Sequence, residues 1–247
     1  MKAVILAGGL GSRLKPFTQV IPKPLLPIGE KSVLEVQIEL LKKFGFNEIF
    51  LATNYKSEYI KNFFGDGSRY GVKLTISKEE KPLGTAGPLT LLSEELTEPF
   101  LVMNGDVLTG LDFRKFYNFA IQKGAKLTMG IKEVVQPFEF GNIFFEGDLV
   151  FDIEEKPDIV SNIMAGIYLL KPEIFEIIPK NEYFGMNTLV ETMLAKNWSV
   201  AKYDIKEHWL DIGRAEDYST AQDIYRTYFA ENQIKERIAV NGQYLNY

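Results

Sequence analysis

Short apolar runs of strand length alternate with amphipathic runs of helix length through the first half of this chain of 247 residues. The apolar run at 3–7 stops at a glycine pair, and segments of helix or loop length separate it from further apolar runs at 48–54, 72–77 and 100–106. A run that is apolar on both faces is typical of a strand buried in a parallel sheet, where helices form the connections. The alternation therefore predicts a doubly wound α/β fold with a mixed, mostly parallel sheet.

Capping and stop signals locate the helices between these strands. Ser32 and Glu35 form a capping box at the start of a helix expected over 32–45, and Gly45 ends it. A helix over 85–96 tolerates Pro88 because the proline would lie in the first turn. We expect the other helices at 56–64, 112–123, 187–197 and 214–232.

The pattern changes after residue 132. A hairpin is expected at 141–157, with its turn at 146–148, and a further strand at 165–171. Because no linker, repeat or low-complexity tract divides the chain, we expect one domain over 1–232. Its parts would be a first half at about 1–131, a β-rich half at about 132–213 that forms a lobe over the sheet, and a C-terminal helix at 214–232, followed by a tail at 233–247.

Composition excludes several classes of protein. The chain has no cysteine, which rules out disulfides, thiolate metal sites and a cysteine nucleophile. Its formal net charge is −5 and it has no basic run, so we expect neither a nucleic acid nor an anionic membrane as partner. Gly8 and Gly9 end the first apolar run too early for a secretion signal, and no run approaches a membrane span, so we expect a cytoplasmic protein.

A glycine-rich segment, AGGLGSRLKP at 7–16, follows the first strand. Ligands of open α/β sheets bind at the carboxyl ends of the strands, and glycines let backbone N–H groups approach phosphate oxygens there. The segment matches neither the P-loop nor the dinucleotide fingerprint, because the required lysine and third glycine are missing. Arg13 lies in this segment, and Lys23 lies between two prolines that keep it out of a helix. Together they predict a phosphate-binding loop with two cations.

Six motifs, in this order, resemble the sugar-1-phosphate nucleotidyltransferase family over about residues 2–228. They are LAGGLGSRLKP with IPKPLLPIG, then PLGTAGPL, MNGDVLT, IEEKP, AGIYLL and WLDIGRAEDY. The resemblance implies a Rossmann-like fold in which 1–131 binds a nucleoside triphosphate and the lobe at 132–213 binds a sugar 1-phosphate. The implied products are a nucleotide sugar and pyrophosphate. Some members carry additional domains, and this chain resembles the catalytic core alone.

The resemblance also assigns residues to the nucleotide. The attacking group is a phosphate oxygen that is already largely ionised at neutral pH, so no general base is needed. The only histidine, His208, is therefore expected to be a packing residue. Arg13 and Lys23 would supply positive charge to the triphosphate. The residues expected to bind the nucleotide are Leu6, Ala7, Gly8, Gly9, Gly11, Ser12, Gly84, Thr85, Ala86, Asn104 and Gly105.

Two carboxylates are the expected ligands of Mg²⁺, for which Mn²⁺ could substitute. Asp106 ends the apolar run at 100–106, and Asp211 lies in the apolar stretch WLDIG. Mg²⁺ is typically held by one or two carboxylates together with phosphate oxygens and water. Taken singly, Asp106 could be a turn residue and Asp211 a helix N-cap; by the resemblance, both hold the metal.

The sugar side is implied by the second half of the chain. By the resemblance Lys156 contacts the sugar phosphate and Glu155 the sugar hydroxyls, although a solvated charged turn would also fit the pattern. Gly141 is also expected to bind the sugar. Many relatives carry asparagine where this chain has Met164, whose thioether is a poor hydrogen-bonding group. Either Asn162 reaches the sugar instead or the substrate is altered at that position, which puts plain mannose 1-phosphate in question.

The base is predicted from the PLGTAGPL motif, which resembles the GTP-using members. Gly84 and Ala86 are expected to leave room for a purine. The alternatives are UTP, dTTP or CTP, or a catalytically silent regulatory subunit that binds nucleotide sugars. The presence of both cations and both carboxylates argues against a silent subunit. The charged run at 78–81 is expected to be solvated, and a homo-oligomer is left open.

Overall fold

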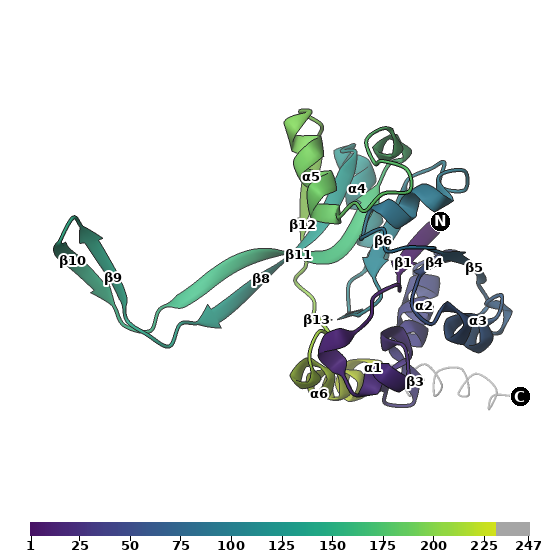
Figure 1. Cartoon of the computed structure of the whole chain (residues 1–247), viewed down its shortest axis with the longest axis horizontal. Coiled ribbons are helices and arrows are strands. Elements are labelled where there is room, and N and C mark those ends of the chain that lie inside the picture. Colours follow the sequence, from purple (N-terminus) through teal and green to yellow (C-terminus); the bar gives the residue numbers. More distant parts are fainter. Residues whose placement is uncertain (231–247) are drawn as a thin grey trace, which may run out of the picture.

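Seven strands form the main sheet in a computed structural model of the protein, which describes residues 1–230 (Figure 1). Neighbouring strands run parallel, except that β11 (Asp158–Leu170) is antiparallel to the strand on each side of it. The predicted mixed, mostly parallel sheet is therefore confirmed. In spatial order the strands are β12 (Val200–Asp204), β8 (Leu127–Pro137), β11 (Asp158–Leu170), β6 (Phe100–Asn104), β1 (Lys2–Leu6), β4 (Glu48–Thr53) and β5 (Lys73–Lys78).

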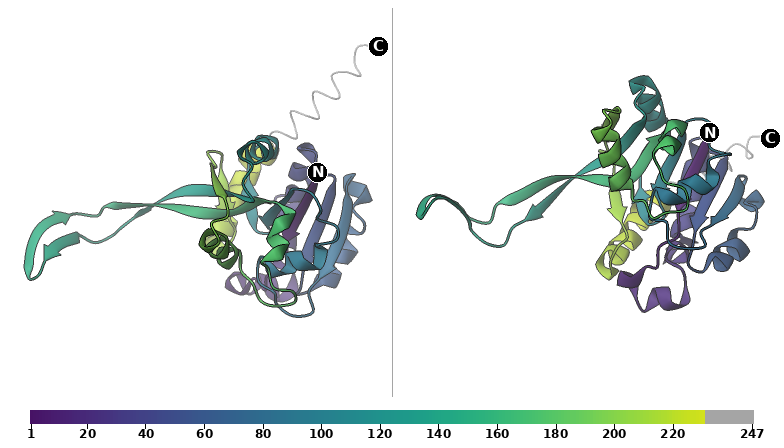
Figure 2. Two further views of the ribbon diagram at one scale, coloured as in Figure 1. Left: turned by 90° about the horizontal axis from the view of Figure 1, so that it is seen from above. Right: turned by 45° about the horizontal axis from the view of Figure 1, so that its top comes forward.

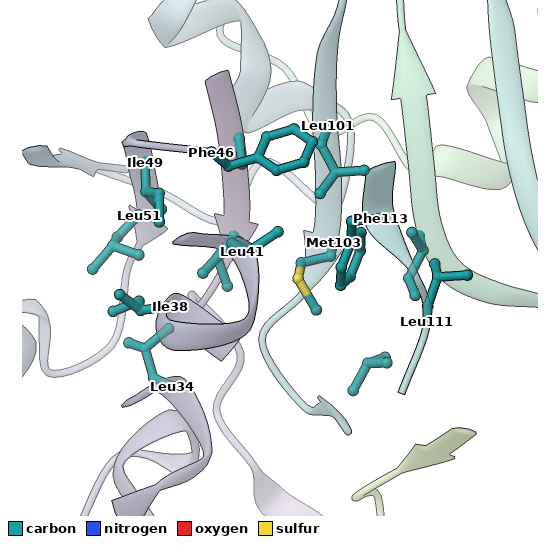
Figure 3. Packing of buried hydrophobic residues seen from close by; sticks show 14 of the residues in the cluster. Leu34, Ile38, Leu41, Phe46, Ile49, Leu51, Leu101, Met103, Leu111 and Phe113 are labelled. Atoms are coloured by element: carbon teal, nitrogen blue, oxygen red, sulfur yellow. The ribbon is translucent and has the colours of Figure 1, made fainter. Parts of the chain in front are cut away.

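Successive residues of the central strands enter two different cores, one on each face of the sheet. Ala3 and Ile5 of β1 lie in the first core, whereas Val4 lies in the second. The first core is shown in Figure 3, where Leu34, Ile38 and Leu41 pack onto β4 and β6. Each fully buried leucine, isoleucine or phenylalanine contributes roughly 1.5–3 kcal/mol through the hydrophobic effect. This two-sided burial explains why the strands are apolar throughout.

Helices cover both faces. The first core is closed by α2 (Val33–Lys43), α3 (Ser57–Phe64) and α4 (Phe113–Lys123), and the second by α5 (Met186–Ala195) with 3-10 helices at Gly87–Leu92 and Pro172–Glu176. The predicted capping box of α2 is confirmed, since the N–H of Glu35 donates to the Ser32 hydroxyl and the N–H of Ser32 to the Glu35 carboxylate. Among the described residues, no helix combines the length and apolarity needed to cross a membrane.

The helix predicted at 85–96 is wrong, because only the 3-10 helix at Gly87–Leu92 forms there. The N–H groups of Ala86 and Gly87 both donate to the carbonyl of Phe184, and Pro88 has no N–H. The first turn is thus bonded to a neighbouring segment and does not start an α-helix.

The opening segment packs against the C-terminal helix. A third core joins Leu14 and Ile28 to Ile212 and Tyr225, which brings the opening segment and the C-terminal helix together. The predicted helix at 214–232 is α6 (Ala215–Ile224) continued by a π-helix (Tyr225–Ala230); the rest of it and the predicted tail at 233–247 lie outside the described residues.

The smaller elements are α1 (Phe17–Val20), 3-10 helices at Ser12–Leu14, Lys23–Leu25 and Ser68–Tyr70, and the strand pairs β2 (Pro27–Ile28) with β3 (Lys31–Ser32) and β7 (Val107–Thr109) with β13 (Trp209–Asp211).

Residues 132–164 form a long arm that projects from the sheet (Figures 1 and 2). The predicted hairpin is confirmed at its tip, where β9 (Asn142–Glu146) pairs with β10 (Leu149–Glu154). We expected the segment to form a lobe over the sheet, and its position differs from that expectation. The physical reason is that β8 and β11 stay paired from Ile131–Met164 out to Pro137–Asp158, which carries the chain straight outward.

Candidate active site

The carboxyl ends of β1 and β6 meet at one edge of the sheet. The strands are parallel neighbours in register, with Leu6 beside Asn104. The N–H of Gly105 donates to the Leu6 carbonyl over 2.9 Å, and a Cβ at Gly105 would lie only 2.8 Å from the same oxygen. Glycine is therefore required where the chain turns away from β6, and the turn is held directly beside the start of the opening loop.

The opening loop leaves β1 at this edge and keeps part of its backbone open. No described atom lies within 4 Å of a Cβ built at Gly9, so a ligand can approach the main chain there. Gly11 has a φ of +60°, and a Cβ on it would lie 2.7 Å from Cγ2 of Thr18. The Thr18 hydroxyl donates to the Gly11 carbonyl over 2.7 Å. The loop is thus anchored at Gly11 and exposed at Gly9.

Lys23 and Asp106 form an ion pair at this edge of the sheet. The Lys23 Nζ lies 2.5 Å from Oδ2 of Asp106, and their side chains are 11% and 25% exposed. The two prolines around Lys23 place it in a one-turn 3-10 helix on a stiff loop. The other oxygen of Asp106, Oδ1, is buried without a hydrogen-bond partner among the described residues.

Asp211 is the second carboxylate at this point. It lies on β13 opposite Val107 of β7, and the N–H of Ile212 donates to the Asp106 carbonyl over 2.9 Å. Asp211 is not a helix N-cap, since Arg214 occupies that position for α6. Burial, and after it the charge of Asp106, raise the pKa of Asp211, whereas Lys23 and Arg13 lower it.

These two carboxylates fit a divalent cation. Oδ1 of Asp211, like that of Asp106, is buried and has no hydrogen-bond partner in the described part of the chain. Two unpaired, buried carboxylate oxygens are costly unless a cation or donor satisfies them. Residues 1–230 contain no cluster of three or more acidic, histidine or cysteine ligands. A cation held here would therefore need oxygens from a substrate, as Mg²⁺ with a phosphate substrate does.

Arg13 lies on the other side of the aspartates, exposed to solvent. A Cβ at Gly213 would lie 3.5 Å and 3.6 Å from its two terminal nitrogens, so the guanidinium rests against the turn that follows Asp211. That turn is fixed by Asp217, whose Oδ2 accepts the N–H groups of Gly213 and Arg214. Arg13, Lys23, Asp106 and Asp211 are thus brought together from distant parts of the sequence.

Gln37 is a residue of this site that sequence reasoning missed. It is 2% exposed on α2, and its Nε2 donates to the carbonyls of Asn104 over 2.9 Å and Val107 over 2.8 Å. The amide therefore holds both ends of the turn that carries Asp106. The available signal was a single uncharged amide on the otherwise apolar face of a predicted helix.

Glu79 was also missed, and the expectation that the run at 78–81 is solvated is wrong for it. Its N–H donates to the Thr53 carbonyl, which turns the side chain inward, and the residue is 6% exposed. Oε2 accepts the N–H of Leu83 over 2.8 Å, while a Cβ at Gly8 would lie 3.0 Å from Oε1. Burial raises the pKa of Glu79, and the bond from Leu83 lowers it. A buried carboxylate thus lies beside the start of the opening loop.

Gly84 and Ala86, where room for a purine is expected, pack closely on a neighbouring segment. Gly84 has a φ of +82°, and a Cβ on it would lie 2.6 Å from the Phe184 carbonyl oxygen. Ala86 is fully buried and its N–H donates to that same oxygen. The hydroxyl of Thr85 accepts the N–H of Met186 at the start of α5. Thr85 is exposed and Gly84 partly exposed, and room for a base beside this segment stays a prediction.

The residues expected on the sugar side all lie on the arm. Gly141 and Glu155 are neighbours, since a Cβ at Gly141 would lie 3.1 Å from Oε2 of Glu155. Lys156 follows, and all three occupy the junction between the hairpin and the β8–β11 ribbon, away from the aspartates (Figure 1). Asn162 and Met164 lie nearer the sheet on β11, and Met164 is 42% exposed. Gly141, Glu155 and Lys156 are therefore held away from the strand ends of their own chain, whereas Met164 lies two residues before Gly166, which packs against Asn104 at the end of β6.

His208 packs over Gly110, as expected for a structural histidine. A Cβ at Gly110 would lie 2.3 Å from Cε1 of the ring, and the backbone carbonyl of His208 accepts the N–H of Gly110 and the hydroxyl of Thr109. Burial lowers the pKa of His208.

Comparisons with known proteins show the family of the chain. The family model described as nucleotidyl transferase matches residues 2–227. "Probable mannose-1-phosphate guanylyltransferase 1" of Oryza sativa is 38% identical over 234 residues, which cover 91% of this chain and 64% of that protein. "Mannose-1-phosphate guanyltransferase" of Saccharomyces cerevisiae is 34% identical, covering 96% of this chain and 68% of that protein. The chain spans about two thirds or slightly less of the length of such relatives.

A solved structure is similar over the whole described fold. HddC from Yersinia pseudotuberculosis superposes with a TM-score of 0.72 at 30% identity, covering 91% of this chain and 99% of the other. The same protein complexed with GMP-PN gives a TM-score of 0.70 at the same identity and coverage.

Proposed function

This chain belongs to the nucleotidyl transferase family, and on that premise we propose that it transfers a guanylyl group from GTP to a sugar 1-phosphate, releasing pyrophosphate. The observation that carries the proposal is the convergence of Arg13, Lys23, Asp106 and Asp211 where β1 and β6 end. Cations and carboxylates placed together beside an exposed glycine backbone suit a metal-assisted reaction of a triphosphate.

The proposed reaction needs no covalent intermediate and no general base from the protein. The attacking oxygen belongs to the sugar phosphate, whose second pKa is about 6, so it needs no side chain to remove a proton. Arg13 and Lys23 bind the triphosphate and stabilise the negative charge that grows on the leaving pyrophosphate. The exposed backbone at Gly9 can donate to phosphate oxygens. Lys23 would exchange its bond to Asp106 for phosphate as the substrate enters.

Asp106 and Asp211 would hold Mg²⁺, or Mn²⁺ in its place. Their two unpaired, buried Oδ1 atoms support this assignment. When bound, the cation neutralises phosphate charge and draws the reacting phosphates together. The strand pair β7–β13 keeps the two aspartates adjacent, and Gln37 keeps the Asp106 turn in place.

Glu79 supports GTP over the pyrimidine nucleotides. Guanine presents two donors on one edge, its ring N–H and its 2-amino group, and an ionised carboxylate accepts both. Uracil and thymine present a single imide N–H there. Because Gly8 has no side chain, Oε1 of Glu79 can be reached from the opening loop. The names of the relatives given above also favour a guanylyltransferase.

Mannose 1-phosphate is the sugar phosphate that the names of these relatives favour. Met164 gave a reason to question it. Met164 is 42% exposed and lies two residues before Gly166, where a Cβ would lie 2.5 Å from Nδ2 of Asn104. Its replacement of asparagine therefore keeps a sugar 1-phosphate altered at that position as the alternative to mannose 1-phosphate.

The test is pyrophosphate release from the purified protein with Mg²⁺, over a matrix of GTP, UTP, dTTP, CTP and ATP against mannose, glucose, glucosamine and heptose 1-phosphates. The expected result is the highest kcat/KM with GTP, with a GDP-sugar identified by mass spectrometry. A higher kcat/KM with a pyrimidine triphosphate would overturn the base assignment. Binding of nucleotide sugars without turnover of any pair would overturn the enzymatic assignment.

A further inference from the structure

We propose that the arm of one chain completes the active site of a second copy of the same chain, so that the working unit is a dimer with exchanged arms. The inference rests on the proposed function, because it assigns Lys156 to the sugar phosphate of that reaction. It starts from the finding that the arm carries Lys156 away from Asp106 of its own chain (Figures 1 and 2).

The arm needs a partner because it has no core of its own. Every residue from 133 to 164, all within the described chain, is exposed or only partly buried. A two-stranded ribbon is at best marginally stable in water, and exposed apolar patches of this extent mark interaction surfaces. The most exposed of its large apolar side chains are Leu149 at 77%, Phe151 at 70%, Phe140 at 69%, Phe145 at 67% and Ile153 at 62%.

The arm is built to reach outward and not to fold back. The β8–β11 ladder continues without a break from Met164 to Asp158, opposite Ile131 to Pro137. Seven paired residues span about 20 Å at roughly 3.3 Å per residue, so Lys156 lies at least that far beyond the sheet. The register of the ladder shifts at the base of the arm, between Met164 and Tyr168, so returning Lys156 to the aspartates of its own chain would require a sharp bend at that irregularity. A second chain that meets the arm end-on requires no such bend.

The opening loop and α1 lie beside the candidate active site, and their exposed surface, here called its mouth, matches the arm. Leu10, Phe17 and Val20 of these segments are 65%, 50% and 70% exposed. Arg13 and Lys15 are exposed among them. The arm has the complementary composition, with eight acidic and two basic residues between 132 and 164. A two-fold axis would place each arm at the other chain's mouth in one self-complementary interface.

Lys156 is the residue that the arm would deliver. The only other cation of the arm, Lys132, donates to the carbonyls of Ile205 and Glu207 at the arm's base. Lys156 has a φ of +48°, which is uncommon for a residue with a side chain and is maintained where function requires it. It lies beside Glu155 and Gly141 at the junction where the arm bends. In a partner's site its ammonium would face the sugar phosphate.

Complementation between two inactive variants tests the exchange. Asp106→Asn removes a carboxylate from the strand-end site, and Lys156→Ala removes the cation of the arm. Each variant alone should be at least tenfold less active than wild type. The two variants are co-expressed with different tags and purified as the mixed dimer. This dimer should recover about half of the wild-type kcat, because one of its two sites combines an intact Asp106 with an intact Lys156 from the other chain. No recovery in an isolated mixed dimer would overturn the proposal.

Light scattering gives an independent measurement that does not depend on activity. Wild type should be a dimer, and Phe145→Asp combined with Phe151→Asp should shift it toward monomer and lower kcat. The matched control is Leu194→Asp on α5, where an apolar residue is 57% exposed but lies away from the arm; it should remain a dimer with unchanged activity. A fully active wild-type monomer would overturn the proposal. A wild-type dimer that makes no nucleotide sugar would instead overturn the proposed function and leave the exchanged arms supported by the loss of dimer in the arm variant.

Discussion

The ammonium of Lys23 lies 2.5 Å from Oδ2 of Asp106, although 83 positions separate the two residues in the sequence. This pair offsets the repulsion between Asp106 and Asp211, which acts with burial to raise the pKa of Asp211. It also holds a lysine and a carboxylate at the point where we propose that the triphosphate and its cation bind. The pair therefore stabilises an arrangement of like charges that would otherwise be costly to bury.

Asp106→Asn should keep the fold and lose activity by several orders of magnitude. The side chains are nearly isosteric, but the amide is a weaker cation ligand and no longer neutralises Lys23. EDTA should abolish turnover of wild type, and added Mg²⁺ should restore it. Asp204→Asn, at an exposed position of β12, is the matched control and should behave as wild type. Normal turnover of Asp106→Asn with Mg²⁺ would show that the metal assignment is wrong.

Arg13→Lys should lower kcat more than it weakens triphosphate binding. A lysine cannot reproduce the planar fork of the guanidinium, and the charge that Arg13 stabilises grows in the transition state. We expect a loss in kcat of about tenfold or more, equivalent to about 1.4 kcal/mol of activation free energy. The measurement compares steady-state kcat with GTP binding by calorimetry. Arg226→Lys, on the exposed surface, is the control. Equal effects on binding and on kcat would make Arg13 a simple anchor.

Glu79→Gln should relax the choice of base. The glutamine amide can accept only one of guanine's two donors, whereas its NH₂ group suits a pyrimidine carbonyl. The free-energy preference for GTP over UTP, taken from the ratio of their kcat/KM values, should fall by roughly 1–3 kcal/mol. This is the size of one two-point contact with a base. Stability should change little, because the glutamine oxygen can still accept the N–H of Leu83. Glu80→Gln, its exposed neighbour, is the control. An unchanged ratio would restrict Glu79 to a structural role, through bonds within the chain such as that from Leu83.

Gln37→Met should destabilise the protein and reduce kcat. The methionine keeps the volume but leaves the carbonyls of Asn104 and Val107 buried without their donor, which costs roughly 1–3 kcal/mol. Urea unfolding measures the loss, and the exposed Gln122→Met on α4 is the control. If Gln37 also positions Asp106, kcat should fall at saturating GTP while binding of GTP without Mg²⁺ is preserved. Stability loss with unchanged kcat would restrict Gln37 to a structural role.

Gly11→Ala should cost more than Gly124→Ala, although both glycines have left-handed backbones, with φ of +60° and +70°. An alanine in this region costs roughly 1–2 kcal/mol at either position. Only at Gly11 would the new Cβ meet a fixed atom, Cγ2 of Thr18 at 2.7 Å, because that residue is 2% exposed and bonded to the loop. The melting temperature should fall further in Gly11→Ala than in the control variant, and GTP binding should be impaired in Gly11→Ala alone. Identical melting temperatures would mean that the loop shifts freely.

Local patterns in the sequence determined the elements and their class. The apolar runs, the capping box at Ser32 and the turn at Gly147 each depend on residues a few positions apart, so they can be predicted without knowing the rest of the molecule. The same holds for the opening loop, because its glycines and prolines restrict their own backbone. Family motifs singled out Asp106 and Asp211, but their spacing in the sequence says nothing about the distance between them.

Tertiary structure alone decided which distant groups meet. Gln37 binds the Asp106 turn because α2 packs across β6, and Glu79 turns inward because its N–H is bonded to Thr53 on the neighbouring strand. Phe184 packs against Gly84, which no pattern in the PLGTAGPL motif indicates. The arm extends because two strands, 21 residues apart at their nearest ends, keep pairing beyond the sheet. Such contacts depend on strand register and on packing between segments far apart in the chain, and short-range periodicity carries neither.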